Sequence, residues 1–328
     1  MSKVSVIGAG AWGTTIAILL AERGHEVTLW AHESAGPDKI REYHENQKFL
    51  PGFPLPESIE ITSDYKAAAD SSILFFVVPT QVMRTAAREF SKLIPPQSII
   101  VCGTKGIEEK TLKLPLTILE EEIQTNRLCA LSGPNLATEV AKGLPSATVV
   151  ASRIEELPRI VQSAMMMDRF RVYTNNDVIG VQLGGALKNV IAISAGIAAG
   201  LSLGDNANAA MMVRGIAEIA RLGVAMGAKI ETFSGLSGIG DLMATSFSRL
   251  SRNHQVGEQI AKGKKLKDIL SKTKKVAEGV FTVIGALELA HKMNVRMPIA
   301  EEVYKVLYED KEPFRAISDL MTRSPKGE

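Results

Sequence analysis

The sequence predicts an α/β protein with two domains, a doubly wound and mostly parallel sheet over residues 1–176 and an all-helical domain over residues 177–328. Three observations favour this fold class. Short β-branched segments alternate with helical stretches up to Tyr173, a pattern typical of parallel sheets. After Tyr173 we find no convincing strand. Between the two regions lies one long apolar helix, residues 178–201, whose single charge is Lys188.

The composition is that of an ordinary globular protein with room for a sizeable core. Of the 328 residues, 45% are hydrophobic and 23% are charged, and the net charge is +2, so nothing indicates a nucleic-acid partner or a membrane-surface partner. Cys102 and Cys129 fall in predicted buried strands, lack the spacing of metal ligands and indicate a reducing compartment. Residues 1–10 have no signal-peptide pattern, so we expect a cytoplasmic protein.

Eight short segments of the first domain have the composition of strands. They are residues 3–7, 26–30, 59–62, 72–78, 98–102, 128–131, 147–151 and 170–173. Helical stretches fall between them, including residues 14–23, 81–92 and 114–124. Ligands of such sheets bind beyond the carboxyl ends of the strands, so Lys105, Gly133 and Asn135, which follow two strands, are candidate site residues. A loop with three prolines, residues 46–56, either caps the cleft or connects two elements.

A glycine motif follows the first strand directly. Gly8, Gly10 and Gly13 form G-x-G-x-x-G with a strand before it and a helix after it. In this context Gly8 makes the tight turn, Gly10 lets a pyrophosphate approach the backbone, and Gly13 lets the helix pack on the strand. The motif therefore predicts a Rossmann-type site for NADH, NADPH or both, and the correct flanks disfavour a purely structural turn.

The end of the second strand bears on the choice between the two cofactors. An acidic residue there usually holds the ribose 2′-hydroxyl of NAD. This chain has Trp30, Ala31 and His32 instead, and Glu33 comes slightly late. His32 suits a 2′-phosphate, which favours tolerance of NADPH; the alternative is that it is a surface residue.

Lys188 lies in an apolar helix among small residues, with Gly184 and Gly185 one turn before it. Repeated glycine in a helix indicates close approach by another backbone or a ligand. A buried ammonium is costly unless it is paired or faces a wet cleft, and burial lets it exchange protons near neutral pH. The alternatives are a core helix whose lysine reaches the surface and a membrane span. The polar residues Gln182 and Asn189 argue against the span.

The helical domain contains a second group of polar residues. Asp241, at an apolar helix start, is a candidate partner for Lys188 that would hold the lysine and carry its proton. Ser251, Arg252 and Asn253 offer a hydroxyl, a guanidinium and an amide, which together suit a phosphate. Taken alone, Asp241 is equally a helix N-cap and Arg252 a surface charge. Helices are expected at residues 207–226, 236–243, 248–263, 283–292, 298–308 and 313–321, with a turn and N-cap at residues 204–206.

These motifs resemble the bacterial form of NAD(P)-dependent glycerol-3-phosphate dehydrogenase over nearly the whole chain. The segment GALKNVIA at residues 185–192 and the run LSGIGDLMAT followed by SRN are specific to that family. GAGAWGTT, CGTKGIE, LSGPNLATEVA and VAEGV match it in the same order. The resemblance implies reduction of dihydroxyacetone phosphate to sn-glycerol 3-phosphate with NADPH or NADH, which supplies glycerophospholipid synthesis. It also implies a C-terminal domain like that of 6-phosphogluconate dehydrogenase, and a homodimer without stable membrane insertion.

The resemblance assigns roles to individual residues. It implies Lys188 as the proton donor and acceptor, Lys105 as the group that polarises the carbonyl, and Asp241 as support for Lys188. The residues implied to bind the substrate are Lys105, Gly133, Asn135, Lys188, Asp241, Ser251, Arg252 and Asn253. Those implied to bind the cofactor are Gly8, Gly10, Ala11, Trp12, Gly13, His32, Lys105, Ala137, Arg252, Val276 and Glu278. No metal site is expected.

Three positions depart from the family's common pattern, and two other functions stay open. Ala11 is often Ser in the family, Asn135 is more often Ser or Thr, and Phe281 is often Arg. One alternative function is that of another β-hydroxyacid dehydrogenase with the same two-domain plan. The other is a catalytically silent NAD(P) sensor, which would keep the glycine motif but has no need of the buried lysine and its polar neighbours.

Overall fold

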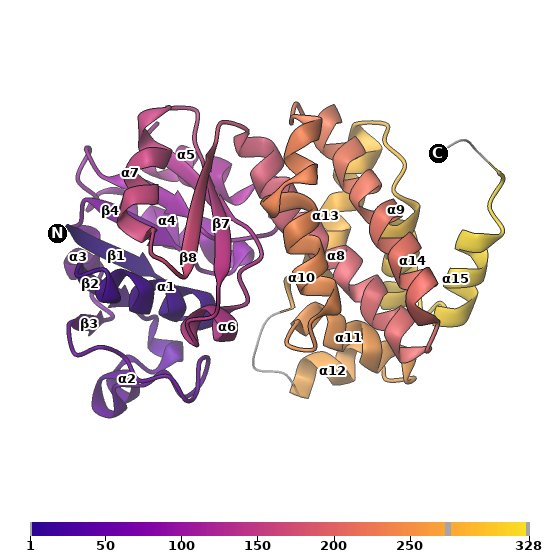
Figure 1. Ribbon diagram of the computed structural model, residues 1–328, viewed down its shortest axis with the longest axis horizontal. Coiled ribbons are helices and arrows are strands. Elements are labelled where there is room, and N and C mark those ends of the chain that lie inside the picture. Colours follow the sequence, from indigo (N-terminus) through magenta and orange to yellow (C-terminus); the bar gives the residue numbers. More distant parts are fainter. Residues whose placement is uncertain (1, 273–276, 326–328) are drawn as a thin grey trace.

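The structure is a computed structural model that describes residues 2–272 and 277–325 (Figure 1). Its N-terminal half contains one sheet of eight strands, and each lies where the sequence predicts a strand. A helical domain follows, so the predicted fold class is confirmed. The strands are β1 (Lys3–Ile7), β2 (Glu26–Trp30), β3 (Ile59–Thr62), β4 (Ile73–Phe76), β5 (Ile99–Cys102), β6 (Leu128–Ser132), β7 (Ser146–Ala151) and β8 (Phe170–Asn175).

The strand order determines where a ligand site can form. The strands lie in the order β3-β2-β1-β4-β5-β6-β7-β8. Strand β7 runs antiparallel to β6, and the other neighbouring strands are parallel. The chain moves from β1 toward one edge of the sheet and then returns to build the other edge from β4. A crevice opens beyond the carboxyl ends of the strands at such a reversal, and the glycine turn that follows β1 lies there.

Helices cover both faces of the sheet, and alternate strand residues meet them. Val4, Val6 and Phe75 pack with α1, α2 and α7 on one face, whereas Leu74 and Phe76 pack with α3, α4 and α5 on the other. These two apolar layers fix the position of the strand ends that carry the site. The helices of this domain are α1 (Ala11–Glu22), α2 (Pro37–Tyr43), α3 (Tyr65–Ala69), α4 (Thr80–Ser91), α5 (Pro115–Ile123), α6 (Ala137–Ala141) and α7 (Glu156–Met165).

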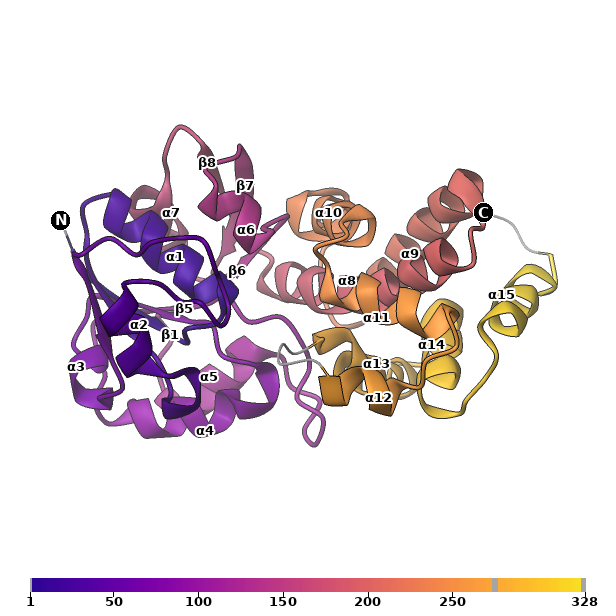
Figure 2. The same cartoon turned by 90° about the horizontal axis from the view of Figure 1, so that it is seen from below.

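The helical domain is arranged around α8, which leaves the sheet domain and runs through its centre (Figure 2). Helices α9, α10, α11, α13 and α14 all contact α8. Helix α8 is long and apolar enough to cross a membrane, but 94% of its apolar window is buried inside the protein, as expected of a core helix. The helices are α8 (Val178–Gly200), α9 (Gly204–Ala225), α10 (Asp241–Phe247), α11 (Arg252–Ala261), α12 (Leu266–Lys272), α13 (Glu278–Lys292), α14 (Pro298–Tyr308) and α15 (Pro313–Met321).

Helices α8 and α11 pack backbone against backbone. A Cβ atom on Gly257 would lie 2.0 Å from the carbonyl oxygen of Ile193, and one on Gly196 would lie 2.0 Å from the carbonyl oxygen of His254. Real Cβ atoms do not approach so closely, so each glycine is required by its neighbour on the other helix. This contact fixes the start of α11, where Ser251, Arg252 and Asn253 lie, relative to Lys188.

One segment of the sheet domain packs into the core of the helical domain. Residues 103–114 connect β5 to α5, and their buried side chains Ile107, Leu112 and Leu114 belong to the same apolar cluster as α8 and α13. Figure 2 shows this segment reaching from the sheet toward α13. The two halves of the chain therefore share part of one core, and the segment carries Lys105 to their boundary.

The structure differs from the sequence predictions in several local features. Residues 204–206, predicted as a turn and N-cap, form the first turn of α9. The chain reverses before them, at Ser202, which has φ +55°. Asp241 follows a π-helical turn, Leu236–Gly240, and its side chain does not cap the helix. Helices α2, α3, α6, α7 and α12 were not predicted, and all of these except α7 are too brief to show a clear apolar period.

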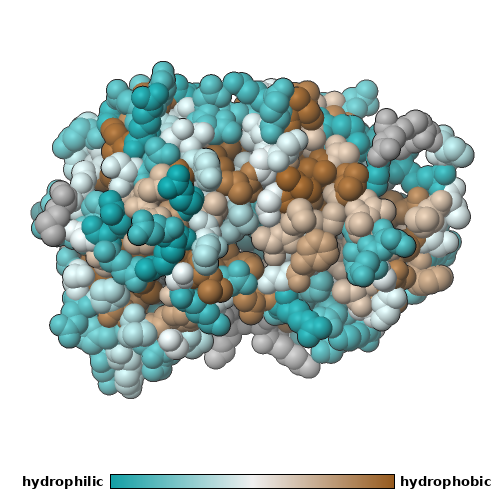
Figure 3. Space-filling view, viewed as in Figure 1, coloured by the Kyte–Doolittle hydropathy of each residue, from teal (hydrophilic) through white to brown (hydrophobic). Residues whose placement is uncertain are grey.

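Apolar residues gather on one surface of the helical domain (Figure 3). Val213 and Val224 of α9 are 51% and 47% exposed, and Met243 and Phe247 of α10 are 48% and 60% exposed. Larger groups of exposed apolar side chains are typical of surfaces that meet another protein.

We expect Gly257→Ala to lower the free energy of unfolding by about 1–3 kcal/mol, because the added methyl group must push α8 and α11 apart. Gly240→Ala is the matched control, since the nearest atom to its Cβ position, the carbonyl oxygen of Gly235, is 3.6 Å away. Urea unfolding of both variants measures the difference. Equal stability of the two variants would contradict the backbone contact between these helices.

Candidate active site

Three charged side chains from distant parts of the chain meet between the two domains. Asp241, the first residue of α10, is 1% exposed, and its carboxylate accepts hydrogen bonds from two ammonium groups. Lys188 of α8 donates to Oδ1, and Lys105 donates to Oδ2 at 2.6 Å. Lys105 also donates to the carbonyl oxygen of Gly133 at 3.1 Å. The contact between Asp241 and Lys188 that the sequence predicts is therefore present.

The environment of Lys188 changes its proton affinity. Burial lowers the pKa of Lys188 to about 8, the positive charge of Lys105 acts in the same direction, and the negative charge of Asp241 opposes both. With all three groups ionised, the cluster has a net positive charge, which suits an anionic substrate. A lysine in this pKa range can release and recover a proton near neutral pH, as a general acid or base must.

Glycines of α8 allow this cluster to form. A Cβ atom on Gly184 would lie 2.3 Å from the carbonyl oxygen of Ser237, in the π-helical turn that leads into Asp241. A Cβ atom on Gly185 would lie 2.4 Å from Oγ of Ser132. A larger residue at position 184 would displace the turn that leads to Asp241, and one at position 185 would displace Ser132 of β6.

The glycine turn after β1 has the shape that a dinucleotide needs. Gly8 has φ +120°, and a Cβ atom there would lie 2.7 Å from the carbonyl oxygen of Val77, beyond the end of β4. A Cβ atom on Gly13 would lie 1.9 Å from the carbonyl oxygen of Gly8, so α1 begins in contact with the turn. At Gly10, no described atom lies within 4 Å of the Cβ position. The open backbone at Gly10 lies at the N-terminus of α1 and fits the pyrophosphate of NADH or NADPH.

The loop with three prolines, residues 46–56, contacts the glycine turn through the side chain of Asn46. Asn46 is fully buried, and its side-chain amide donates to the carbonyl oxygen of Ala9 and to Oγ1 of Thr14, both at 2.8 Å. The sequence alone leaves open whether this loop caps the cleft or connects two elements. The contacts of Asn46 show that at least the first residue of the loop anchors the glycine turn.

Four further residues expected to bind cofactor lie along the same edge of the sheet. Ala11 and Trp12 begin α1, and a Cβ atom on Gly103 would lie 3.4 Å from Nε1 of Trp12. His32 is exposed, and its Nδ1 accepts a hydrogen bond from the backbone N–H of Ser34 at 3.2 Å, which leaves Nε2 free of that bond. The carbonyl oxygen of Ala137, at the start of α6, accepts from Thr15 at 3.2 Å.

Glu278 lies at the boundary between the domains as the first residue of α13. Burial raises its pKa to about 7, while the backbone N–H of Thr80 and the charge of Arg252 oppose that rise. Its Oε2 would lie 3.3 Å from a Cβ atom on Gly106, next to Lys105. Val276, also expected to bind cofactor, lies outside the described residues.

The residues expected to hold a phosphate lie at the N-terminus of α11. Ser251 is the N-cap, and its hydroxyl oxygen accepts from the backbone N–H of His254 at 3.3 Å. Arg252 is exposed and forms no ion pair within the part of the chain that the structure describes. Asn253 is buried, donates to Oδ1 of Asn189 at 2.9 Å and accepts from the N–H of Gly279 at 3.0 Å. Asn253 therefore joins α8, α11 and α13, and only part of its amide is left for a ligand.

Two polar atoms beside Lys105 are buried without a described hydrogen-bond partner. They are Oδ1 of Asn135 and Oγ of Ser132. Asn135 donates its amide N–H to the carbonyl oxygen of Ala147 at 2.9 Å, which fixes the orientation of the side chain. Unpartnered buried polar atoms at a boundary between domains fit a site that a polar ligand completes.

Thr245 is a member of the cluster that the sequence did not single out. Lys188 donates to its Oγ1 at 2.6 Å, and Thr245 is 3.3 Å from Oδ1 of Asp241. The available signal was its position four residues after Asp241, which places both on one face of α10. No group of three or more metal-ligating side chains is found in residues 2–272 and 277–325.

Two family profiles match this chain. The profile described as NAD-dependent glycerol-3-phosphate dehydrogenase N-terminus matches residues 3–157, and the corresponding C-terminus profile matches residues 177–318. Glycerol-3-phosphate dehydrogenase (NAD(P)+) of Citrifermentans bemidjiense is 48% identical over 330 residues, which cover 99% of this chain and 98% of that protein.

Solved structures give a similar result. The glycerol-3-phosphate dehydrogenase of Coxiella burnetii matches with a TM-score of 0.94 and 35% identity, over 98% of this chain and 99% of that one. D-mandelate dehydrogenase in complex with NADH matches with a TM-score of 0.64 and 14% identity, over 94% of this chain and 98% of that one, which shows a shared fold.

Proposed function

The chain belongs to the family of NAD-dependent glycerol-3-phosphate dehydrogenases, and on that premise we propose how its residues divide the work of the reaction. The enzyme reduces dihydroxyacetone phosphate to glycerol 3-phosphate with NADH or NADPH. When bound, NADH or NADPH would supply the hydride that the carbonyl carbon accepts. The observation that carries our proposal is the carboxylate of Asp241 held between the ammonium groups of Lys188 and Lys105.

Lys188 is the proton donor for the oxygen that becomes a hydroxyl group. Its lowered pKa makes the ammonium a better acid than a free lysine, and Thr245 and Asp241 hold Nζ in one position. In the reverse reaction the neutral amine takes the proton back. Because reduction needs the ammonium form, its rate is supported below a pH of about 8 and falls as the pH rises through that value.

Lys105 stabilises the negative charge that develops on the same oxygen. Its ammonium is fixed by Asp241 and the carbonyl oxygen of Gly133, so it needs little rearrangement during the reaction. Asp241 acts through both lysines, and its own oxygens are occupied by them.

The N-terminus of α11 holds the substrate phosphate. Arg252 supplies a guanidinium whose geometry matches phosphate oxygens, and Ser251 and Asn253 supply polar groups at the positive end of the helix dipole. On the side of the sheet domain, we assign Gly133, whose carbonyl oxygen accepts from Lys105, and the neighbouring Asn135 to the substrate site. Binding of the phosphate orients the carbonyl group toward Lys188, which lowers the entropic part of the barrier.

Gly8, Gly10 and Gly13 would hold the pyrophosphate of the cofactor at the N-terminus of α1. We assign residues 1–176 to NAD(P) binding and residues 177–328 to substrate binding and proton transfer. The exposed histidine at position 32 supports use of NADPH, since Nε2 of its imidazole can donate a hydrogen bond to a 2′-phosphate. We further propose a cytoplasmic homodimer that supplies glycerophospholipid synthesis; the buried free cysteines and the apolar surface of α9 and α10 support the first two of these points.

The function is tested by following nicotinamide absorbance after addition of dihydroxyacetone phosphate, with NADH and NADPH in parallel. We expect rapid oxidation by the native enzyme and a turnover lower by about 10²-fold or more in Lys188→Ala, which lacks the proton donor. Cofactor binding and thermal stability of the variant are the controls. Near-native turnover in the folded variant would remove Lys188 from its role.

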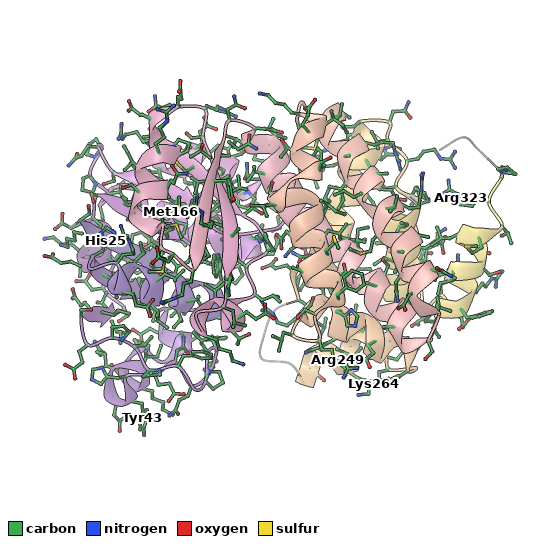
Figure 4. The ribbon with its side chains drawn as sticks, in the orientation of Figure 1. His25, Tyr43, Met166, Arg249, Lys264 and Arg323 are labelled. Atoms are coloured by element: carbon green, nitrogen blue, oxygen red, sulfur yellow. The ribbon has the colours of Figure 1, made fainter. Side chains whose placement is uncertain are left out.

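We expect Arg252→Ala to raise KM for dihydroxyacetone phosphate by at least about tenfold and to change KM for the cofactor much less, because the guanidinium binds the substrate phosphate. Arg249→Ala is the matched control: Arg249 is exposed, lies three residues earlier and is labelled at the lower edge of the helical domain in Figure 4. Steady-state kinetics with each substrate varied in turn measures both constants. An equal loss for substrate and cofactor, or the same loss in the Arg249 variant, would contradict the assignment.

A further inference from the structure

Lys105 lies on the connecting segment formed by residues 103–114. A side chain of helix α4 forms hydrogen bonds with backbone groups of this segment. The side-chain amide of Gln81 donates to the carbonyl oxygen of Ile107 at 3.0 Å, and its Oε1 accepts from the backbone N–H of Glu109 at 3.1 Å. One side chain therefore satisfies two backbone groups of residues 103–114, two and four positions after Lys105. A loop held in this way has few alternative paths.

Arg84, one turn further along α4, holds the same segment by charge. Its guanidinium donates to both carboxylate oxygens of Glu108, with a shortest distance of 2.7 Å, and to Glu121 and Glu122 of α5. Glu108 is only 8% exposed and also accepts a hydrogen bond from Thr111. Forked contacts between arginine and a buried carboxylate restrict geometry strongly.

The other side of the segment is fixed by the helical domain. Ile107 is 1% exposed, and its Cγ2 would lie 2.8 Å from a Cβ atom on Gly285 of α13. The segment of residues 103–114 is therefore held between helix α4 of the sheet domain and helix α13 of the helical domain. Lys105 leaves it at this boundary and reaches Asp241.

We propose that Gln81 and Arg84 are positioning residues for the reaction, which fix the backbone from which Lys105 reaches Asp241 and the substrate. Neither touches the three charged groups of the site. They act by limiting residues 103–114 to one backbone conformation. The backbone of Lys105 then has a fixed position, from which its long flexible side chain extends. This inference rests on the proposed role of Lys105 in stabilising the developing charge.

Loss of this support has a consequence beyond lower stability. The charge of Lys105 is one of the influences that lower the pKa of Lys188. When Lys105 moves away, the pKa of Lys188 rises, so the residual reductase activity should persist to higher pH. A purely structural role of Gln81 and Arg84 would not move the alkaline limb of the pH profile.

The test compares Gln81→Ala, Arg84→Ala and Arg84→Lys with Lys105→Met in the native full-length chain. Arg88→Ala is the matched control, because Arg88 lies one turn further along α4, pairs with Glu122 and forms no hydrogen bond with residues 103–114. Measured quantities are kcat, KM for each substrate, the pH profile of kcat/KM and thermal stability.

We expect kcat to fall about tenfold or more in Gln81→Ala and Arg84→Ala, since small misplacements of a catalytic group have effects of up to about 10²-fold. KM for the cofactor should change little, and the alkaline limb should move to higher pH in the same direction as in Lys105→Met. Arg84→Lys, which keeps a charged partner for Glu108, should recover part of the loss, and Arg88→Ala should behave as the native enzyme.

Two results would overturn the inference, and they are distinguishable. If Lys105→Met is impaired but Gln81→Ala and Arg84→Ala keep the native kcat and pH profile, the positioning role is wrong and the proposed function stands. If Lys105→Met itself keeps native kinetics, the role of Lys105 is wrong and the inference fails with it. Because Gln81 and Arg84 hold the segment by different contacts, either variant alone tests the idea if the other does not fold.

Discussion

The structure depends on one buried carboxylate shared by two ammonium groups. Removing an ion from water costs several kcal/mol even after relaxation, so three such groups persist between the domains only when opposite charges are paired and their hydrogen bonds are satisfied. Asp241 meets this condition with Lys188 and Lys105, and Thr245 and Gly133 complete the set. The segments that carry these residues must therefore be held in place.

The packing of the rest of the chain provides this placement. The glycines of α8 let the π-helical turn and strand β6 approach Lys188, and the contact between α8 and α11 sets the distance to the phosphate site. Residues 103–114 are fixed between α4 and α13. The same burial that requires this support lowers the pKa of Lys188, so stability and proton transfer have one physical origin.

The sequence predicts the features that local patterns encode. The eight strands follow from β-branched runs, the dinucleotide turn from three glycines in their context, and the pairing of Lys188 with Asp241 from two charges in apolar helices. Other contacts between residues distant in the sequence were not predicted. Lys105 meets Asp241 across 136 positions. Asn253 donates a hydrogen bond to Asn189, and Ile107 packs into the core of the helical domain. Neither contact produces a periodic pattern in the sequence.

The most direct test of this account is the pKa of Lys188, measured by NMR on protein with 13Cε-labelled lysine and assigned by comparison with Lys188→Met. We predict titration near pH 8 in the native enzyme and at a lower pH in Asp241→Asn, because the negative charge of Asp241 favours the ammonium form. A lysine that titrates near its ordinary value of about 10.4 and does not respond to Asp241→Asn would contradict the shared-carboxylate cluster.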